Sequence, residues 1–346
     1  LYEVGGLFYK DSPSWTSQYM RGVSAWMVRT TTSIVFCLED NMKRKTKLGK
    51  KSYLTLLAIC LGMSISLTGC GDNKSSTDTK GTKTSTSQVK SLVNKDGDNI
   101  ETRYKTPEGY TRVKVANDSF GEFLRQEKLK KYGEKSYYYN GKTKPSEGVY
   151  DSVFDIDLGG KNLLHCADAC FKFRGDYLYK SGQYDKIKFN FVSSGVADFS
   201  KYTKGYRVDP ESGQYFLMAE PDSSEAVYKK FMNLVYGYCG TLSLVKDTHY
   251  VDIDDMQIGD VFVRGGTPGT KRVGHAIMVI DMAENHKGQK VFMLAQSYMP
   301  AQQTQVLVNK ADKELSPWYS LDQVKKAGKM VTPQWTFELN ELKRFN

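Results

Sequence analysis

The sequence predicts an α+β domain in which a helix that carries a cysteine packs on a mainly antiparallel sheet. Two segments, 161–184 and 223–240, repeat apolar residues every three or four positions, as helices do. Three later segments are short, apolar and bounded by glycine or polar residues, as strands are: 258–266, 274–282 and 290–299. Because helices come first and strands follow as a run, the order favours α+β over alternating α/β.

The composition is that of a globular protein with a basic leader. The chain has 346 residues, of which 40% are hydrophobic and 25% are charged, and its formal net charge is +10. Six positive residues fall in one short run, 43–51, and no later Lys/Arg cluster is interleaved with aromatic residues. The charge therefore does not predict a nucleic-acid groove, and we expect no nucleic-acid partner.

A targeting signal explains the basic run. An apolar stretch, 54–67, follows it and is too short to span a bilayer. The stretch ends in Leu67-Thr68-Gly69-Cys70, which resembles the lipobox of bacterial lipoproteins. That resemblance implies cleavage before Cys70, a lipid on its thiol, and a protein anchored to a membrane on the extracytoplasmic side of a bacterial envelope.

Four regions follow from this. Residues 1–41 precede a good start methionine and are predicted to be an upstream extension that is absent from the mature protein. Residues 42–69 are the lipoprotein signal peptide, and 70–103 are a Ser/Thr/Lys-rich tether that has too few apolar residues to bury a core. Residues 104–346 are the folded domain.

The elements of this domain follow in order. The first helical spacing covers 119–133, and the alternation at 149–157 predicts a strand or an extended loop. The 161–184 helix is the strongest, with Gly182 as its stop, and 187–192 alternates as a strand. The 223–240 helix has a Ser/Glu start and a glycine end, before the strands named above.

Cys166 is the candidate nucleophile. It lies in the first turns of the 161–184 helix, where the helix dipole and unpaired N–H groups stabilise a thiolate. Cys170 lies deeper in the helix and is predicted to pack in the core. The rigid helix disfavours a disulfide between them, and no further CxxC or HxxxH completes a zinc site. We expect no metal or cofactor, and Asp168 and Arg174 are expected to be structural surface charges.

His275 is the candidate base. Alternation on its strand places His275, Ile277, Val279 and Asp281 on one face, and both faces are mostly apolar, so the strand is predicted to be central. An imidazole next to a cysteine can accept its proton if a polar group orients the ring. Gln296, on the next strand, is the predicted orienting residue, and Ser297 and Asp281 are alternatives.

The order of these motifs resembles the NlpC and CHAP groups of the papain-like superfamily, over roughly Asp155 to Ser297. The resemblance implies a papain-like fold and hydrolysis of amide bonds in cell-wall peptides. "HCADACFKFRGDYLY" and "GHAIMVID" resemble more closely a bacterial lipoprotein-type family known only as a domain of unknown function. The chain departs from NlpC enzymes in having His165-Cys166-Ala167 in place of Asp-Cys-Ser, and in its Tyr-rich insertion "GYRVDPESGQYFLMAEP".

The sequence thus predicts a membrane-anchored cysteine hydrolase, with Cys166 as nucleophile, His275 as general base and acid, and Gln296 as the orienting group. Its expected substrate is an amide bond of peptidoglycan. The alternative is a non-catalytic lipoprotein that binds glycan or peptide, for which tyrosines supply stacking surfaces. An acyltransferase that uses the same Cys/His pair is a third reading.

Overall fold

The computed structural model describes residues 91–267, 269–270 and 272–346. These residues fall within one compact unit, Ser85–Asn346. The lipidation site at Cys70, the signal peptide 42–69, the extension 1–41 and most of the tether 70–103 lie outside the described residues. Among the residues that are described, no helix is both long enough and apolar enough to span a membrane.

The helices of the described part, in chain order, are α2 (Ile100–Arg103), α3 (Phe120–Gln126), α4 (Cys166–Lys180), α5 (Phe199–Tyr202), α6 (Glu225–Tyr238), α7 (Thr241–Lys246) and α8 (Leu321–Ala327). Short 3-10 turns, η1 to η3, lie at Tyr184–Lys186, Ile253–Asp255 and Leu339–Glu341. The strands are β1 (Tyr110–Arg112), β2 (Tyr150–Val153), β3 (Lys188–Asn190), β4 (Val196–Asp198), β5 (Tyr206–Val208), β6 (Tyr215–Leu217), β7 (Thr248–Tyr250), β8 (Val261–Arg264), β9 (His275–Asn285), β10 (Lys290–Gln296), β11 (Gln305–Leu307), β12 (Tyr319–Ser320), β13 (Lys329–Val331), β14 (Thr336–Glu338) and β15 (Leu342–Phe345).

The central element is a nine-stranded sheet ordered β2-β11-β10-β9-β8-β15-β7, with β1 paired to β9 and β12 paired to β10. Its pairings are antiparallel, which confirms the predicted α+β class. β9 lies in the middle and is buried along most of its length, as its two apolar faces predict. The papain-like form of this class has no support from the architecture alone and remains a proposal.

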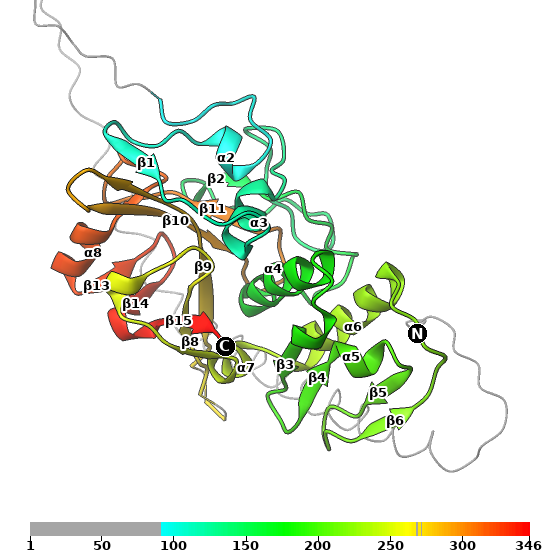
Figure 1. The fold of residues 1–346 in the computed structure, drawn as a ribbon. Coiled ribbons are helices and arrows are strands. Elements are labelled where there is room, and N and C mark those ends of the chain that lie inside the picture. The colour runs from blue at the N-terminus through cyan, green and yellow to red at the C-terminus, as the bar shows by residue number, and fades with distance from the viewer. Residues whose placement is uncertain (1–90, 268, 271) are drawn as a thin grey trace, which may run out of the picture. The chain divides into compact units, whose positions relative to one another are not determined.

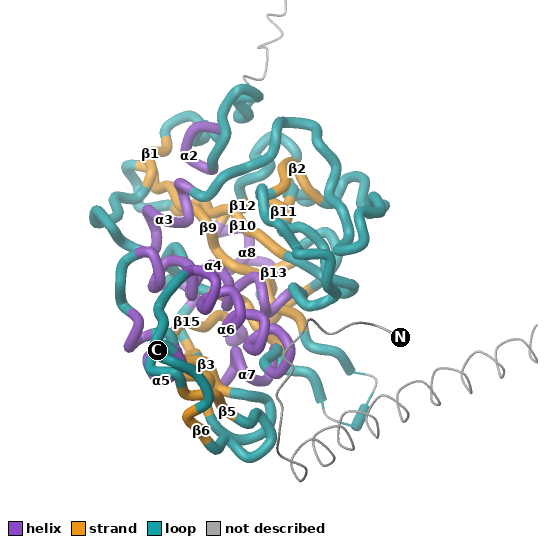
Figure 2. Tube along the Cα trace, turned by 90° about the vertical axis from the view of Figure 1, so that its right-hand side faces the viewer, coloured by secondary structure: helices purple, strands orange, loops and turns teal. Residues whose placement is uncertain are grey.

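Each face of the sheet carries its own core. Helix α4 packs on β9 with α3 beside it, and α6 packs on α4 (Figure 1). The other face is covered by α8, which contacts β10, and by the β13–β14 hairpin, whose β14 contacts β8 (Figure 1). Figure 2 views the domain from the side of α4 and α6. Alternate residues of β9 serve the two cores: Ala276 and Met278 face α4, whereas Ile277 and Val279 face the hairpin side. Burying each large apolar side chain contributes about 1.5–3 kcal/mol.

A β-bulge interrupts the alternation in β9. Met293 pairs with Asp281 and the next residue, Leu294, pairs with Val279, so Ile280 is an extra residue on β9. Beyond it the faces exchange, and Met282 joins the hairpin-side core. The prediction that Asp281 shares a face with His275 was therefore wrong, because strict alternation does not allow for an inserted residue.

The two long predicted helices are present. Helix α4 begins at Cys166 with His165 as its N-cap and ends before Gly182, which has a φ of 70°. Helix α6 has Ser224 as its N-cap, whose side chain accepts a hydrogen bond from Val227 N–H. The 119–133 segment is helical over a shorter range than its spacing predicts, since α3 ends at Gln126.

Candidate functional site

Cys166 is the first residue of α4 and is 8% exposed. The helix start is held by Asp168, whose carboxylate accepts a hydrogen bond of 2.9 Å from the His165 backbone N–H. Such a carboxylate at the third helical position satisfies one N–H at the helix entrance and fixes where Cys166 emerges. Asp168 itself is 2% exposed, so the prediction that it is a surface charge was wrong.

The Cys166 thiol is neutral in this environment. Burial raises its pKa to about 11, and the negative charge of Asp168 adds to the rise. Backbone N–H groups of Ala276, Ala167 and Cys166 itself oppose the rise by hydrogen bonding to the sulfur. A helix N-terminus by itself favours the thiolate, as the sequence predicts, but here desolvation outweighs the helix dipole.

His275 is the first residue of β9 and is 2% exposed. Its Nε2 lies 3.1 Å from Oε1 of Gln296, the last residue of β10. The Gln296 amide nitrogen donates to Gln334 Oε1 at 2.7 Å, which leaves its oxygen to face the ring. Nε2 therefore carries the proton, and Nδ1 keeps the lone pair that can accept one.

The two predicted alternatives to Gln296 have other partners. The Ser297 hydroxyl is completely buried and donates to the backbone oxygens of Gln302, at 2.8 Å, and Leu164, at 3.3 Å. Asp281 forms ion pairs of 2.7 Å with Arg112 and Arg125. Of the three residues considered from the sequence, Gln296 is the one that the structure gives a hydrogen bond to His275.

The His275 ring is enclosed by aromatic side chains. Its centroid lies 4.9 Å from Tyr298, 4.9 Å from Trp335 and 6.0 Å from Phe337. Burial lowers the pKa of His275 to about 4, the Gln296 hydrogen bond opposes this, and the positive charge of Lys144 adds to it. The imidazole is therefore neutral at physiological pH.

Cys166 and His275 meet through shared neighbours. The N–H that reaches the Cys166 sulfur belongs to Ala276, the residue that follows His275. Tyr298 contacts the His275 ring, and the pKa of the same tyrosine is raised by burial and further by the charge of a Cys166 thiolate. The head of α4 and the start of β9 thus converge on one place, where α4 packs on β9.

Two further residues of this site, Lys144 and Tyr298, could not be identified from the sequence. Lys144 belongs to the segment before β2 and is 7% exposed, although lysine is normally a surface residue. Tyr298 follows Gln296 by two positions, and only its position close to that candidate could have drawn attention to it. Tyr298 contacts the His275 ring, and Lys144 contacts Tyr298 and acts on His275 through its charge. Local sequence pattern does not encode these tertiary relations.

The other predicted residues are placed as follows. Cys170 is buried in the α4 core, as predicted, and Cys166, Cys170 and Cys239 are all free thiols. The Arg174 guanidinium lies over the rings of Phe120, Tyr177 and Phe345. This residue is therefore structural, as predicted, and it packs on aromatic side chains. Within the described residues, no group of three or more His, Cys, Asp or Glu is arranged to hold a metal ion.

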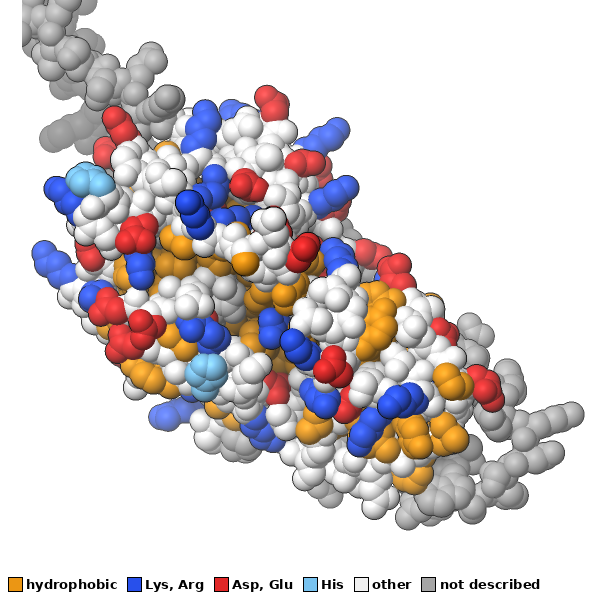
Figure 3. Space-filling model, in the orientation of Figure 1, with side chains coloured by type: hydrophobic (Ala, Val, Ile, Leu, Met, Phe, Trp, Pro, Cys, Tyr) orange, Lys and Arg blue, Asp and Glu red, His pale blue; other side chains and the backbone are white. Residues whose placement is uncertain are grey.

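The Tyr-rich insertion forms the β5–β6 hairpin and its flanks. Phe216, Leu217 and Met218 are 43%, 67% and 65% exposed. Hydrophobic side chains gather at this end of the molecule in Figure 3, over the β5–β6 region labelled in Figure 1. β5 and β6 pair with each other in a two-stranded sheet, separate from the sheet that holds β9.

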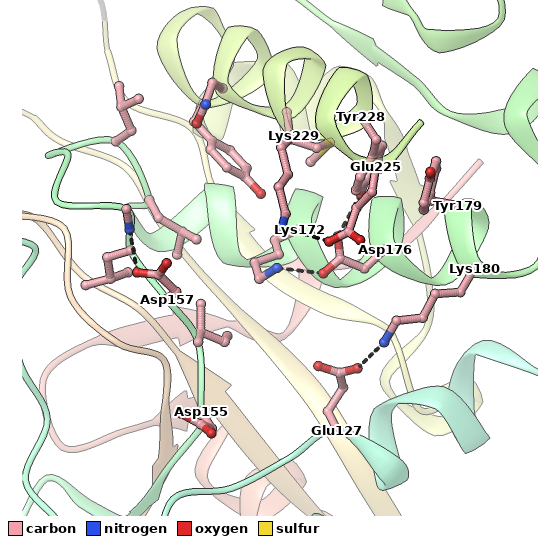
Figure 4. A pocket seen from close by; sticks show the side chains of 18 residues that line it. Glu127, Asp155, Asp157, Lys172, Asp176, Tyr179, Lys180, Glu225, Tyr228 and Lys229 are labelled. Carbon is pink, nitrogen blue, oxygen red and sulfur yellow. Dashed lines mark hydrogen bonds and ion pairs between the residues drawn. The ribbon is translucent and has the colours of Figure 1, made fainter. Parts of the chain in front are cut away.

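A cavity of about 570 Å³ lies between α4, α6 and the 155–164 segment. Neither Cys166 nor His275 lines it, and its charged side chains are largely paired with one another (Figure 4). Lys172 bonds Asp176 at 2.6 Å, and Lys229 bonds Glu225 at 2.7 Å. This cavity is therefore separate from the cysteine–histidine site.

Comparison with known proteins places the domain in a family. No curated protein and no solved structure matches the chain significantly, so neither supports a link to NlpC or CHAP enzymes. The family model described as DUF4846, "Domain of unknown function (4846)", matches residues 100–344, which agrees with the closer of the two resemblances in the sequence. Because this match covers most of the chain, the protein belongs to the DUF4846 family.

Proposed function

We propose that this domain is a cysteine amidase that is anchored by a lipid on Cys70 outside the cytoplasmic membrane and hydrolyses amide bonds of cell-wall peptides. One observation carries the proposal: Gln296 Oε1 lies 3.1 Å from Nε2 of a buried histidine whose neighbour, Ala276, donates its N–H to the Cys166 sulfur. This combines an oriented base with a cysteine at a helix N-terminus, which is the arrangement that thiol hydrolases need.

The chemistry would start from a neutral pair. As the Cys166 sulfur attacks the amide carbonyl carbon, its proton passes to Nδ1 of His275, and the Cys166 backbone N–H at the helix start stabilises the oxyanion. The C–N bond then breaks and His275 returns the proton to the leaving amine. Water, deprotonated by His275, hydrolyses the thioester, which releases the acyl group as a carboxylate and restores the thiol.

The cell-wall substrate and the anchor rest on sequence resemblance. The lipobox-like ending at Cys70 implies an extracytoplasmic address, where peptidoglycan is the abundant amide polymer. The NlpC-like and CHAP-like order of Cys166, His275 and a polar residue implies amide hydrolysis. These two resemblances are independent, because the first lies in the leader and the second in the folded domain.

A second candidate, a binding lipoprotein without catalysis, is favoured by the resting protonation states. A thiol with a pKa of about 11 beside an imidazole with a pKa of about 4 does not form a thiolate–imidazolium pair in the free protein. A binding protein has no need of that pair, whereas a hydrolase must create it when the substrate arrives.

Alkylation of the three free thiols in the described part of the chain, Cys166, Cys170 and Cys239, separates the candidates. Purified protein is treated with iodoacetamide between pH 5 and 9, and each cysteine is followed by peptide mass spectrometry. For a hydrolase we expect Cys166 to react faster at pH 7 than Cys170, which is also buried, because His275 can accept the thiol proton during the attack although the resting pair is neutral. We expect His275→Ala or Gln296→Leu to slow Cys166 about tenfold or more. Hydrolysis of cell-wall stem peptides would be lost in Cys166→Ala.

Because Cys170 is alkylated in the same sample, its rate is an internal reference for an unactivated buried thiol. If Cys166 reacts no faster than Cys170, and His275→Ala changes neither rate, the imidazole does not act on the thiol. The binding lipoprotein would then be the better account, and Cys166→Ala would retain affinity for cell-wall fragments.

A further inference from the structure

Lys144 is a buried amine with too few partners. Its side chain hydrogen-bonds Gln302 Oε1, and its Nζ lies over the Tyr298 ring at 4.8 Å from the centroid. An ammonium has three N–H donors, and no ion pair joins Lys144 to a carboxylate of the described residues. A buried charge of this kind is costly unless an anion compensates it.

The segment around Lys144 holds this amine in place. Its backbone N–H donates to Ser136 O at 2.9 Å, and bridges join Tyr137 to Thr143 and Tyr138 to Gln302. The backbone is thus tied both to its own turn and to the segment after β10. These backbone contacts fix the position of the Lys144 side chain, as is typical of functional residues held on a rigid support.

Tyr298 connects Lys144 to the cysteine–histidine site. The Tyr298 ring lies 4.8 Å from Lys144 Nζ and 4.9 Å, between centroids, from the His275 imidazole. Burial raises the pKa of Tyr298, and the charge of Cys166 adds to the rise. The unpaired N–H groups of Lys144 therefore belong to the immediate surroundings of the proposed nucleophile and base.

We propose that Lys144 is the carboxylate-recognition residue of this site, so that the substrate carries a free carboxylate close to the bond that is cleaved. The inference rests on the proposed function and specifies its substrate class: an acidic acyl donor, such as a peptide in which a carboxylate neighbours the scissile amide. An incoming carboxylate pairs with the free N–H groups of Lys144 by charge-assisted hydrogen bonds.

Carboxylate binding also activates the base. The Lys144 charge lowers the pKa of His275 in the free protein. A bound carboxylate neutralises that charge, which makes it easier for His275 to accept the Cys166 proton. The neutral resting pair and the unpaired amine then have one explanation, since the substrate itself supplies the missing anion.

Two alkylating reagents of matched size test this. Iodoacetate carries a carboxylate and iodoacetamide does not, so their rate ratio at Cys166 reports carboxylate recognition beside the thiol. The full chain is compared with Lys144→Met, Lys144→Arg and Lys142→Met, an exposed lysine two residues away. We expect the iodoacetate-to-iodoacetamide ratio to fall about tenfold in Lys144→Met and to change little in Lys144→Arg and Lys142→Met. An equal ratio in wild type and Lys144→Met would overturn the proposal.

A second measurement does not depend on thiol reactivity. Acetate is titrated at pH 6 while the His275 imidazole signals, identified by their loss in His275→Ala, are followed by NMR. We expect these signals to shift in wild type and Lys142→Met but not in Lys144→Met. If Cys166 is inert to both reagents but this shift occurs, the hydrolase fails and the carboxylate site stands. If acetate leaves the signals unchanged in wild type, the carboxylate site is refuted even where Cys166 is reactive.

Discussion

At the residue scale, the site is governed by competition between burial and local polar contacts. Cys166 and His275 are both almost fully buried, and burial disfavours the charged form of each. Gln296 and the Ala276 N–H pull in the opposite direction, but they are neutral groups. Two charged groups add to the effect of burial: Asp168 further raises the pKa of Cys166, and Lys144 further lowers the pKa of His275.

Lys144→Met is expected to stabilise the protein at neutral pH. Burial lowers the pKa of Lys144 to about 8, below its ordinary value of 10.5. Between these values the unfolded chain binds more protons, so wild-type stability rises as pH increases from 8 to 10.5. Below pH 8 the full penalty applies, and methionine removes it, for a gain of about 1–2 kcal/mol at pH 7.

Urea unfolding at pH 7, 8, 9 and 10.5 measures this effect. The difference between Lys144→Met and wild type should be largest at pH 7 and should shrink as the pH approaches 10.5. Lys142→Met should show no such trend, because that lysine is exposed. A mutant that is less stable than wild type at pH 7 would show that the amine stabilises the fold.

At the element scale, β9 combines two functions through its bulge. Before the bulge, His275 is the first residue of β9 and lies in the candidate site. After the bulge, the Asp281 side chain lies on the α3 side and forms ion pairs with Arg125 of α3 and Arg112 of β1. A completely buried carboxylate with two guanidinium partners ties helix and edge strand to the central strand, which positions one face of the sheet.

Asp281→Ala should therefore be strongly destabilising. The change leaves two arginines without their carboxylate, and Arg125 is itself 5% exposed. Removing one partner of a buried ion pair costs about 3–5 kcal/mol. Thermal and urea unfolding measure the loss, and Asp155→Ala, which removes an exposed carboxylate, should stay within about 0.5 kcal/mol of wild type. A loss below about 1 kcal/mol would show that the triad contributes little.

At the scale of the whole molecule, the end of the described chain completes the sheet. β15 lies between β8 and β7, and Arg344 on it pairs with Asp260 through hydrogen bonds of 2.7 and 2.8 Å. Asp260 is 1% exposed. The β13–β14 hairpin, which supplies Trp335 and Phe337 around His275, precedes β15 directly, so this region serves both the fold and the site.

A truncation that removes residues 342–346 is expected to disrupt the domain. It deletes an interior strand, opens the edge of β8, and leaves Asp260 buried without its arginine. Circular dichroism melting and limited proteolysis should show loss of the cooperative transition. Arg344→Met, which keeps the strand but removes the charge pair, should unfold cooperatively at a lower temperature. A truncated chain that melts like wild type would show that β15 is dispensable.

The sequence by itself determined the elements and the candidates for chemistry. Apolar spacing located α4, α6 and the central strands, because side-chain periodicity is a local property of the chain. The same reasoning selected Cys166 at a helix start and Gln296 on the strand next to that of His275. The hydrogen bond between Gln296 and His275 needs only that the end of one strand lies beside the start of its neighbour. The family match over residues 100–344 agrees with the resemblance seen in the motifs.

Only the tertiary structure decided what surrounds those candidates. The bulge at Ile280, the burial of Asp168 and the approach of Lys144 to Tyr298 arise between segments far apart in sequence. The pKa values of Cys166 and His275 follow from that packing, and the raised pKa of Cys166 is opposite to what a helix N-terminus alone predicts. Desolvation depends on every neighbouring atom, whichever part of the chain supplies it, and so it is set by the assembled core rather than by any local pattern.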